Sequence, residues 1–581
     1  MTRSLCLLST VLLALAPLSI GQDHGLADLG PRTSGRPIPP GQTCYDVLHY
    51  GLTLKVDPET QTIDGSVRMT ARWLRPSDHI VLDLDDHLST KRVALVAANG
   101  TEINPGLDLP FKHLGREIRI SVDSAFEAAE LAPSQEFALI IEYGGSPRVA
   151  PRPPWDGGFQ WSTTTDGKPW IATSCQMQGP DLWWPCKDQP DDEPESMDIH
   201  ITVPDGLICA SNGQLVNSVA QEGWRTFNWR VNTPINPYGI ALNIGPYELL
   251  SREVESVAGD RFSIKYWVLP QNLEKGKVLF EDIVRQTRWF EETFGPYPFR
   301  GDKYGVVETP HLGMEHQSII AYGNEYRGNP WGADQGFDFL HHHEMAHEWW
   351  ANLVTCRNWK DFWIHEGFAT YAQSLYTESL KGPIAYRQRM SEIRRGIRNQ
   401  APIAPRQPMA TADIYFGSAG GDIYNKGAWV MHTLRWLVNN DKDFFHMMRR
   451  MAYPDERLEQ TTDGSACRFT DTEEIRSIAE KHTGLELAWF FEAYVRTGPL
   501  PKLEDKRDGD SLSLRWLNPA GEPFDFPLPV ELQLDGKMRR ISMLGGKATV
   551  DVKGIESIVI DPHSWLLKEE TRAKRKPDQN H

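Results

Sequence analysis

The sequence predicts a multidomain α+β protein, with a strand-rich N-terminal part, a mainly helical middle and a small strand-rich C-terminal part. The chain has 581 residues, which is too long for one hydrophobic core. Apolar and polar residues alternate with a period of two in the first half and again near the C-terminus, as in antiparallel strands with one solvated face. Between these parts, apolar residues recur every three or four positions, which is typical of amphipathic helices.

The composition is that of a globular protein. Apolar residues make up 40% of the chain and charged residues 24%, so there is enough material for packed interiors. The net charge is −17, and the acidic residues are spread along the chain. Because phosphate binding needs clustered Lys and Arg, this charge argues against nucleic acid as a partner.

The N-terminus predicts export. Residues 1–21 place Arg3 before a short apolar run, which is followed by the small-residue pattern of a signal-peptide cleavage site. We expect cleavage after Gly21, with Ala16 as the alternative. The apolar run is shorter than the roughly 20 residues that a spanning helix needs, so we expect a mature protein without a membrane span. It would lie in a periplasm or outside the cell.

Residues 22–43 follow and are rich in Gly and Pro, which predicts a linker. Residues 44–250 are predicted to form an N-terminal β-rich domain. In HYGLTLKVDPETQTIDGSVRMTARWL, residues 49–74, the period of two continues on both sides of a turn, and similar short runs extend to about residue 244. Six cysteines remain after cleavage of the signal, and their pairing is left open.

Residues 251–502 are predicted to form the mainly helical domain, and residues 503–567 the C-terminal β-domain, followed by a tail over 568–581. We expect helices over residues 276–295, 337–355, 366–382, 426–440 and 470–484. Gly295-Pro296 and Gly382-Pro383 are the stop signals of two of them.

The helix over 337–355 carries a metal-binding pattern. His343 and His347 are four residues apart, so their imidazoles share one helix face, and Glu344 lies between them in the order H-E-x-x-H. Zinc takes two imidazole nitrogens readily, and a carboxylate that does not bind the metal can take a proton from water. His341 and His342 point elsewhere around the helix and are interpreted as ordinary polar residues.

A third ligand is needed to distinguish this site from an amphipathic helix with hydrogen-bonded histidines. A metzincin would have Gly at position 350 and His at 353, but the chain has Trp350 and Leu353. Glu366 follows His347 by nineteen residues, on the next predicted helix. Two histidines and a glutamate from two neighbouring helices complete a catalytic zinc site.

These motifs resemble the aminopeptidase N family of zinc metallopeptidases, the gluzincins that include leukotriene hydrolase. The resemblance rests first on H-E-x-x-H, which is separated by eighteen residues from a Glu within W-x-x-E-G-F-A. Three further stretches occur in the family's order: TSCQMQGPDLWWPCKDQP (173–190), HLGMEHQ (311–317) and IYNKGA (423–428). The resemblance covers nearly the whole mature chain. It implies an N-terminal saddle domain, a thermolysin-like catalytic domain and a small C-terminal β-sandwich.

The resemblance also implies the roles of individual residues. One Zn²⁺ per chain would be held by His343, His347 and Glu366, with Glu344 as general base. Tyr424 would donate a hydrogen bond to the oxyanion. The free amino group of a peptide would be bound by Glu315 and by Gln176, for which Gln178 is a rival. Gly313 and Met314, which precede Glu315 in the same loop, would also bind the substrate. The expected activity is that of an aminopeptidase.

Some positions depart from the family's pattern. Leu312, His316 and His365 replace its usual residues, so the side-chain preference at the substrate's N-terminus stays open. No large C-terminal helical domain is expected, which predicts an open cleft or one closed by a second subunit. Whether the protein is a homo-oligomer is also left open.

Two other functions compete with the aminopeptidase. One is an epoxide hydrolase like leukotriene hydrolase, and the other is a non-catalytic peptide-binding scaffold. A scaffold has no physical need for the intact ligands, base and amine-binding glutamate together, so a catalytic protein is favoured.

Overall fold

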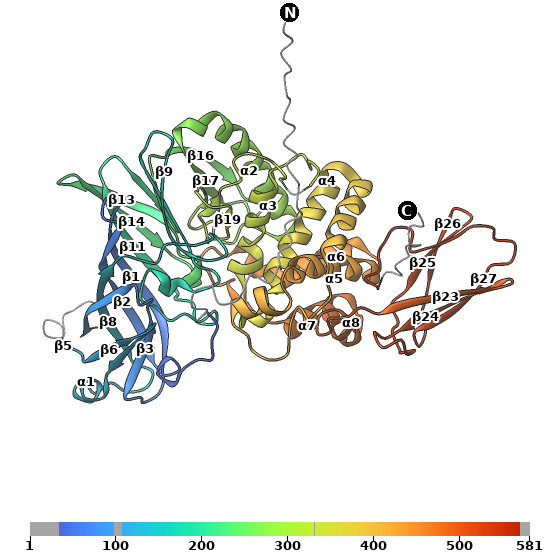
Figure 1. Cartoon of the computed structure of the whole chain (residues 1–581), viewed down its shortest axis with the longest axis horizontal. Helices are drawn as coiled ribbons and strands as arrows, with labels where there is room; N and C mark the ends of the chain where they lie inside the picture. Colours follow the sequence, from blue (N-terminus) through green and yellow to red (C-terminus); the bar gives the residue numbers. More distant parts are fainter. Residues whose placement is uncertain (1–33, 98–106, 331, 570–581) are drawn as a thin grey trace, which may run out of the picture.

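The computed structural model describes residues 34–97, 107–330 and 332–569. Three parts lie in a row in chain order, with β-sheets at both ends and the helices between them (Figure 1). The multidomain α+β fold predicted from the sequence is confirmed. The predicted signal peptide lies outside the described residues, as do residues 22–33 and 570–581. Within the described ranges, none of the helices has the length and apolarity needed to span a bilayer.

The N-terminal part is built on an eight-stranded sheet of order β13-β14-β11-β1-β2-β8-β4-β5. Strands β1 and β2 form the long antiparallel hairpin that the period of two predicts. The one α-helix among the described residues of this part, α1, spans Asp123–Ala128. The strands are β1 Tyr45–Asp57, β2 Thr62–Trp73, β3 His79–Asp83, β4 Leu88–Val96, β5 Leu107–Asp108, β6 Phe111–Leu114, β7 Glu117–Ser121, β8 Glu136–Gly145, β9 Gly158–Thr163, β10 Pro169–Ser174, β11 Ser196–Pro204, β12 Ile208–Ser211, β13 Gln214–Gln221, β14 Trp224–Val231 and β15 Leu242–Gly245.

Residues 34–43, the described part of the predicted linker, pack against the folded protein. Ser34 is buried; its hydroxyl donates to Asp188 Oδ1 at 3.0 Å and accepts from Trp359 Nε1 at 3.1 Å. Arg36 pairs with the buried carboxylate of Asp83. Gly35, at φ 72°, lies so close to the Trp359 ring that a Cβ there would clash with it. This segment therefore bridges the N-terminal part and the mainly helical middle part.

The middle part combines helices with a five-stranded sheet of order β16-β17-β18-β20-β19. The β16–β17 hairpin spans the boundary predicted between residues 250 and 251. The elements are β16 Glu248–Glu255, β17 Arg261–Val268, α2 Leu273–Phe294, β18 Tyr304–Glu308, β19 Gly313–Met314, β20 Ile320–Tyr322, α3 Phe339–Ala346, β21 Val354–Cys356, α4 Trp363–Gly396, α5 Asp422–Val438, α6 Asp441–Ala452, β22 Arg468–Thr470, α7 Thr472–Thr483 and α8 Ala488–Tyr494.

Two predicted helix ends are wrong. Helix α3 stops at Ala346 instead of residue 355, because the chain leaves the helical conformation at Trp350 and enters β21, which pairs with β22. Helix α4 does not stop at Gly382. That glycine takes a left-handed φ of 78° and kinks the chain, and a new helical stretch starts at Pro383 and runs to Gly396. Proline has a φ suited to the first turn of a helix, so Gly-Pro here bends the helix without ending it.

The C-terminal part consists of two three-stranded sheets, of order β23-β24-β27 and β26-β25-β28. Their strands are β23 Lys502–Asp508, β24 Ser511–Leu517, β25 Val530–Leu534, β26 Lys537–Ile541, β27 Lys547–Asp551 and β28 Ile558–Ile560. The six cysteines that follow the predicted signal are all described, and all are free thiols.

Candidate metal centre

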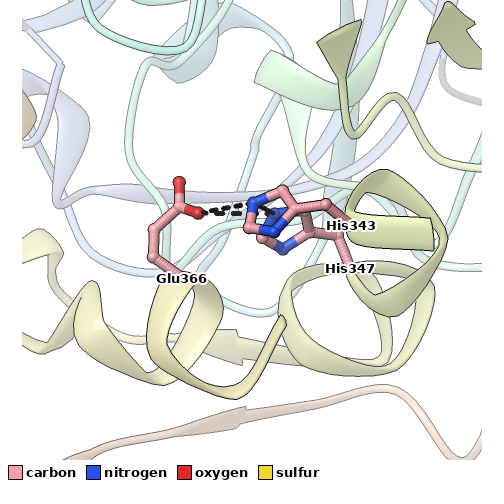
Figure 2. A group of neighbouring side chains, drawn as sticks. All are labelled: His343, His347 and Glu366. Carbon is pink, nitrogen blue, oxygen red and sulfur yellow. Dashed lines mark hydrogen bonds and ion pairs between the residues drawn. The ribbon is translucent and has the colours of Figure 1, made fainter. Parts of the chain in front are cut away.

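Three side chains from two helices point toward one another (Figure 2). His343 lies in α3, and His347 is the C-terminal cap of that helix. Glu366 lies in the first turn of α4. His343 Nε2 lies 3.2 Å from Glu366 Oε2 and 3.3 Å from His347 Nε2. His347 Nε2 lies 3.5 Å from the same carboxylate oxygen. The three atoms thus form a small triangle.

Local structure explains this placement. Asp338 caps α3, and its carboxylate accepts from His341 N at 3.0 Å. His347 keeps a helical backbone although the helix ends at Ala346, so the four-residue spacing still places both imidazoles on one face. His365 Nε2 accepts from Cys356 N at 3.0 Å and ties the start of α4 to β21. Helix α4 therefore begins with Glu366 opposite α3.

The triangle has the dimensions of a zinc site. Zinc–ligand bonds of about 2.0–2.1 Å in tetrahedral geometry place ligand atoms about 3.3 Å apart. His347 Nδ1 donates to the Trp350 carbonyl at 3.1 Å, which leaves Nε2 with a lone pair directed at the site. Tyr424 Oη donates to Glu366 Oε1 at 2.8 Å, which leaves Oε2 facing the histidines. The residues present therefore fit the metal.

The charges of the site also favour a cation. Burial disfavours the protonated form of His347, but the hydrogen bond with Glu366 and the charges of Glu366, Glu315 and Glu344 raise its pKa to about 10. Burial likewise opposes ionisation of Glu366, yet His343 and His347 hold its pKa well below that of an ordinary glutamate. Three buried carboxylates around one imidazole attract positive charge, whether a proton or a metal ion.

Glu344 lies next to the triangle. Ligand atoms of Glu315, Glu344 and His347 all lie within 4.8 Å of one another. Burial raises the pKa of Glu344 well above its ordinary value, the nearby His347 lowers it, and the charges of Glu315 and Glu366 raise it further. A carboxylate with a raised pKa is a stronger base than a free one.

Glu315 is held by side chains from the N-terminal part. Gln176 Nε2 and Tyr238 Oη both donate to Glu315 Oε1, the second at 3.2 Å. Asn352 Nδ2 donates to the Glu315 carbonyl at 3.1 Å. Gln178 instead donates to Asp156 Oδ1 at 3.0 Å, so it is Gln176 that contacts Glu315. Tyr238 and Asn352 were not found from the sequence, since no spacing relates them to the loop of Glu315.

Gly313 and Met314 form β19, a short edge strand paired with β20. A Cβ at Gly313 would clash with Glu344 Oε1 and would lie 2.8 Å from Leu340 Cδ1. The glycine therefore lets this strand approach the catalytic helix.

Two further glycines of the sequence motifs, to which the sequence assigns no role, lie where α4 and α5 meet. Gly367 on α4 and Gly427 on α5 face each other, and a Cβ on either would lie 2.8 Å from the other's Cα. This close approach of the two helices brings the Tyr424 hydroxyl to Glu366. The two glycines thus position Tyr424, because the lack of a side chain at both positions lets α4 and α5 pack closely.

The other histidines lie away from the triangle. His341 is buried, with its Nε2 2.7 Å from Tyr304 Oη and its Nδ1 2.7 Å from Gln286 Oε1. His342 is buried among aromatic rings, with the Tyr376 ring stacked at 4.7 Å. His316, which replaces the family's usual residue, is fully buried, and burial lowers its pKa well below the ordinary value.

Together, the fold and these residues define the class of zinc metallopeptidases with a His-His-Glu site. Sequence comparison identifies the family: the Peptidase M1 N-terminal domain matches residues 46–238, and the Peptidase family M1 domain matches residues 280–464. The chain belongs to the M1 family of zinc aminopeptidases, as its motifs predict.

Similar proteins agree with this assignment. Aminopeptidase B of Rattus norvegicus is 26% identical over 516 residues, which cover 82% of this chain and 73% of that protein. Leukotriene A-4 hydrolase of Xenopus laevis is 25% identical, over 57% of this chain and 51% of that protein. The crystal structure of an M1 zinc metallopeptidase from Deinococcus radiodurans shares the fold, with a TM-score of 0.60 and 22% identity over 79% of this chain and 96% of that one.

Replacing Gly427 by Ala tests the helix contact. The added methyl group forces α5 away from α4 and moves Tyr424 from Glu366, and a displacement of this kind costs up to about 10²-fold in rate. We expect kcat/KM on an aminoacyl-anilide to fall by roughly tenfold or more, with the zinc content unchanged. Gly417→Ala is the control, since nothing lies within 4 Å of a Cβ there. Equal activity of both variants would contradict the positioning role.

Proposed function

We propose that this M1 enzyme is an exported aminopeptidase that removes single residues from the N-terminus of peptides. The observation that carries the proposal is the position of Glu315, whose carboxylate lies within 4.8 Å of ligand atoms of His347 and of Glu344, the proposed base. A second carboxylate beside a catalytic centre is suited to bind an ammonium group. It would fix the substrate's free end one residue away from the bond that is cut.

His343, His347 and Glu366 would hold the zinc ion, which would supply polarisation of a carbonyl and a lowered pKa of a water molecule. Glu344 then takes the proton of the attacking water on its carboxylate and passes it to the leaving amine. The Tyr424 hydroxyl, now bonded to Glu366, lies at the edge of the site, where it can donate to the developing oxyanion. Gln176 and Tyr238 orient Glu315 toward the substrate's amino group.

Relatives support a peptide substrate. A fold relative from Deinococcus radiodurans, 21% identical, is described as bound to a Tyr-Ser-Ala substrate in a Glu-to-Ala variant. The relatives named aminopeptidase B cover most of this chain. Short peptides with a free N-terminus are therefore the proposed substrates.

Replacing Glu315 by Gln tests the recognition of the free end. A charge-assisted hydrogen bond contributes about 1.5–3 kcal/mol, which corresponds to roughly a ten- to hundredfold preference for a free over an acetylated N-terminus. We expect the wild type to discriminate by at least this factor and Glu315→Gln to lose most of it. Glu274→Gln, on the exposed start of α2, is the control. Equal hydrolysis of free and acetylated substrates by the wild type would indicate an endopeptidase.

Metal analysis tests the centre itself. We expect one zinc per chain by mass spectrometry of the purified protein, and loss of most of it in His347→Ala and Glu366→Gln, because each removes one of three ligands. His446→Ala, an exposed histidine on α6, should keep the metal. Zinc bound without turnover of any unblocked substrate would instead favour the non-catalytic scaffold or the epoxide hydrolase.

Export rests on residues 1–21 alone. We expect N-terminal sequencing of the mature protein, recovered from outside the cytoplasm, to start at Gln22, or at Pro17 if the alternative site is used. A cytoplasmic protein that retains the whole apolar run would refute this part of the proposal.

A further inference from the structure

Ser318, three residues after Glu315, has a backbone conformation that residues other than glycine rarely adopt. Its φ is 59°, and the residue is fully buried. Its backbone N donates to Glu348 Oε1 at 2.8 Å, and its Oγ accepts from Gly213 N at 2.9 Å. A residue persists in this left-handed region only where the surrounding structure fixes it, and such residues cluster at functional sites. The neighbours of this loop therefore determine where it lies.

Lys303 is one of these neighbours. The side chain is buried, and Nζ donates to the Ser318 carbonyl at 2.9 Å and to the Ser211 carbonyl at 3.0 Å. The centroids of the Trp229 and Trp267 rings lie 5.1 and 5.7 Å from Nζ. Burying an amino group costs free energy unless its donors are used. Lys303 uses them to join the loop to the end of β12, in the N-terminal part.

Asn212, which follows β12, joins the same loop to the turn that carries Tyr238. Its Nδ2 donates to the Gln317 carbonyl at 2.7 Å and to the Gly239 carbonyl at 2.8 Å. Its Oδ1 accepts from Ala241 N at 2.8 Å. The side chain is fully buried, so these three hydrogen bonds are made away from water. One carboxamide therefore ties together the loop and the turn of Tyr238.

We propose that Asn212 and Lys303 are positioning residues that fix the Glu315 carboxylate for the amino group of the substrate. This role rests on the proposed function, in which Glu315 binds the free end of a peptide. Each residue acts through another. Asn212 holds the turn of Tyr238, whose hydroxyl donates to Glu315 Oε1 at 3.2 Å. Lys303 holds the carbonyl of Ser318, at the other end of the loop.

The place of the carboxylate matters because a charge-assisted hydrogen bond depends steeply on distance and angle. A displacement of about 1 Å at a site of this kind costs up to about 10²-fold in rate. Both positioning side chains cross the boundary between the N-terminal part and the middle part. Loss of either one therefore moves Glu315 relative to Tyr238, whereas the zinc ligands, which lie on other segments, stay in place.

Asn212→Leu and Lys303→Met test this role, because each removes the donors with little change in side-chain size. In the purified zinc-containing variants, kcat/KM is measured for an aminoacyl-anilide and for its acetylated form. We expect the ratio of the two values to fall by about tenfold or more in both variants, with the zinc content unchanged. In a Glu315→Gln background, neither change should lower the ratio further, because the group that they position is already gone.

Asn243→Leu is the matched control. Asn243 is buried in β15, the neighbour of β12 in the same sheet, and its Nδ2 donates to the Ala210 carbonyl at 3.3 Å. The variant also loses a buried carboxamide, but not one that contacts the loop of Glu315. It should therefore keep the wild-type ratio.

A variant with the near-UV circular dichroism of the wild type and an unchanged ratio would overturn the role of its residue. An equal loss of rate on both substrates would overturn it as well, since a merely structural role lowers both rates together. If Asn212→Leu does not fold, Lys303→Met decides. Failure of the proposed function has a different signature, because the wild type itself would then treat the free and acetylated substrates alike, and the positioning role would be refuted with it.

Discussion

The gathering of carboxylates around His347 is the interaction on which the rest of this structure depends. Glu315, Glu344 and Glu366 are all buried within reach of that imidazole, and burying three negative charges is costly unless a cation accompanies them. The triangle of His343, His347 and Glu366 offers such a cation the ligands of a zinc site. Folding of the catalytic part and binding of the metal are thereby linked, since the ligands come from separate helices.

The active site is shared between two parts of the chain. The helices supply His343, His347, Glu344 and Glu366, whereas Gln176 and Tyr238, which hold Glu315, come from turns of the N-terminal part. The segment over residues 34–43 crosses the same boundary, since Ser34 contacts both Asp188 and Trp359. The Trp359 ring in turn packs edge-on against Tyr238, at 5.3 Å. The relative position of the two parts thus decides where the Glu315 carboxylate lies relative to His347 and Glu344.

Much of the site was predictable because its main pattern is local. Four-residue spacing on a helix places His343 and His347 side by side whatever surrounds them, and Glu344 must then lie next to them. The alternation that predicted β1 and β2 is likewise a property of neighbouring residues. The ends of α3 and α4 were predicted wrongly because packing decided them. Trp349 and Trp350 are fully buried, and the chain must turn there to pair β21 with β22.

The sequence by itself determined the types of residue that hold the metal, the order of strand-rich and helical parts, and the family of the protein, because these depend on short-range spacing and on motifs. Only the tertiary structure decided that Gln176, and not Gln178, contacts Glu315. It also decided that Tyr238 and Asn352 hydrogen-bond to Glu315. The close contact of Gly367 with Gly427, which brings Tyr424 to Glu366, is likewise a result of packing. These contacts join residues far apart in the chain, and their geometry arises only when helices and sheets pack against one another.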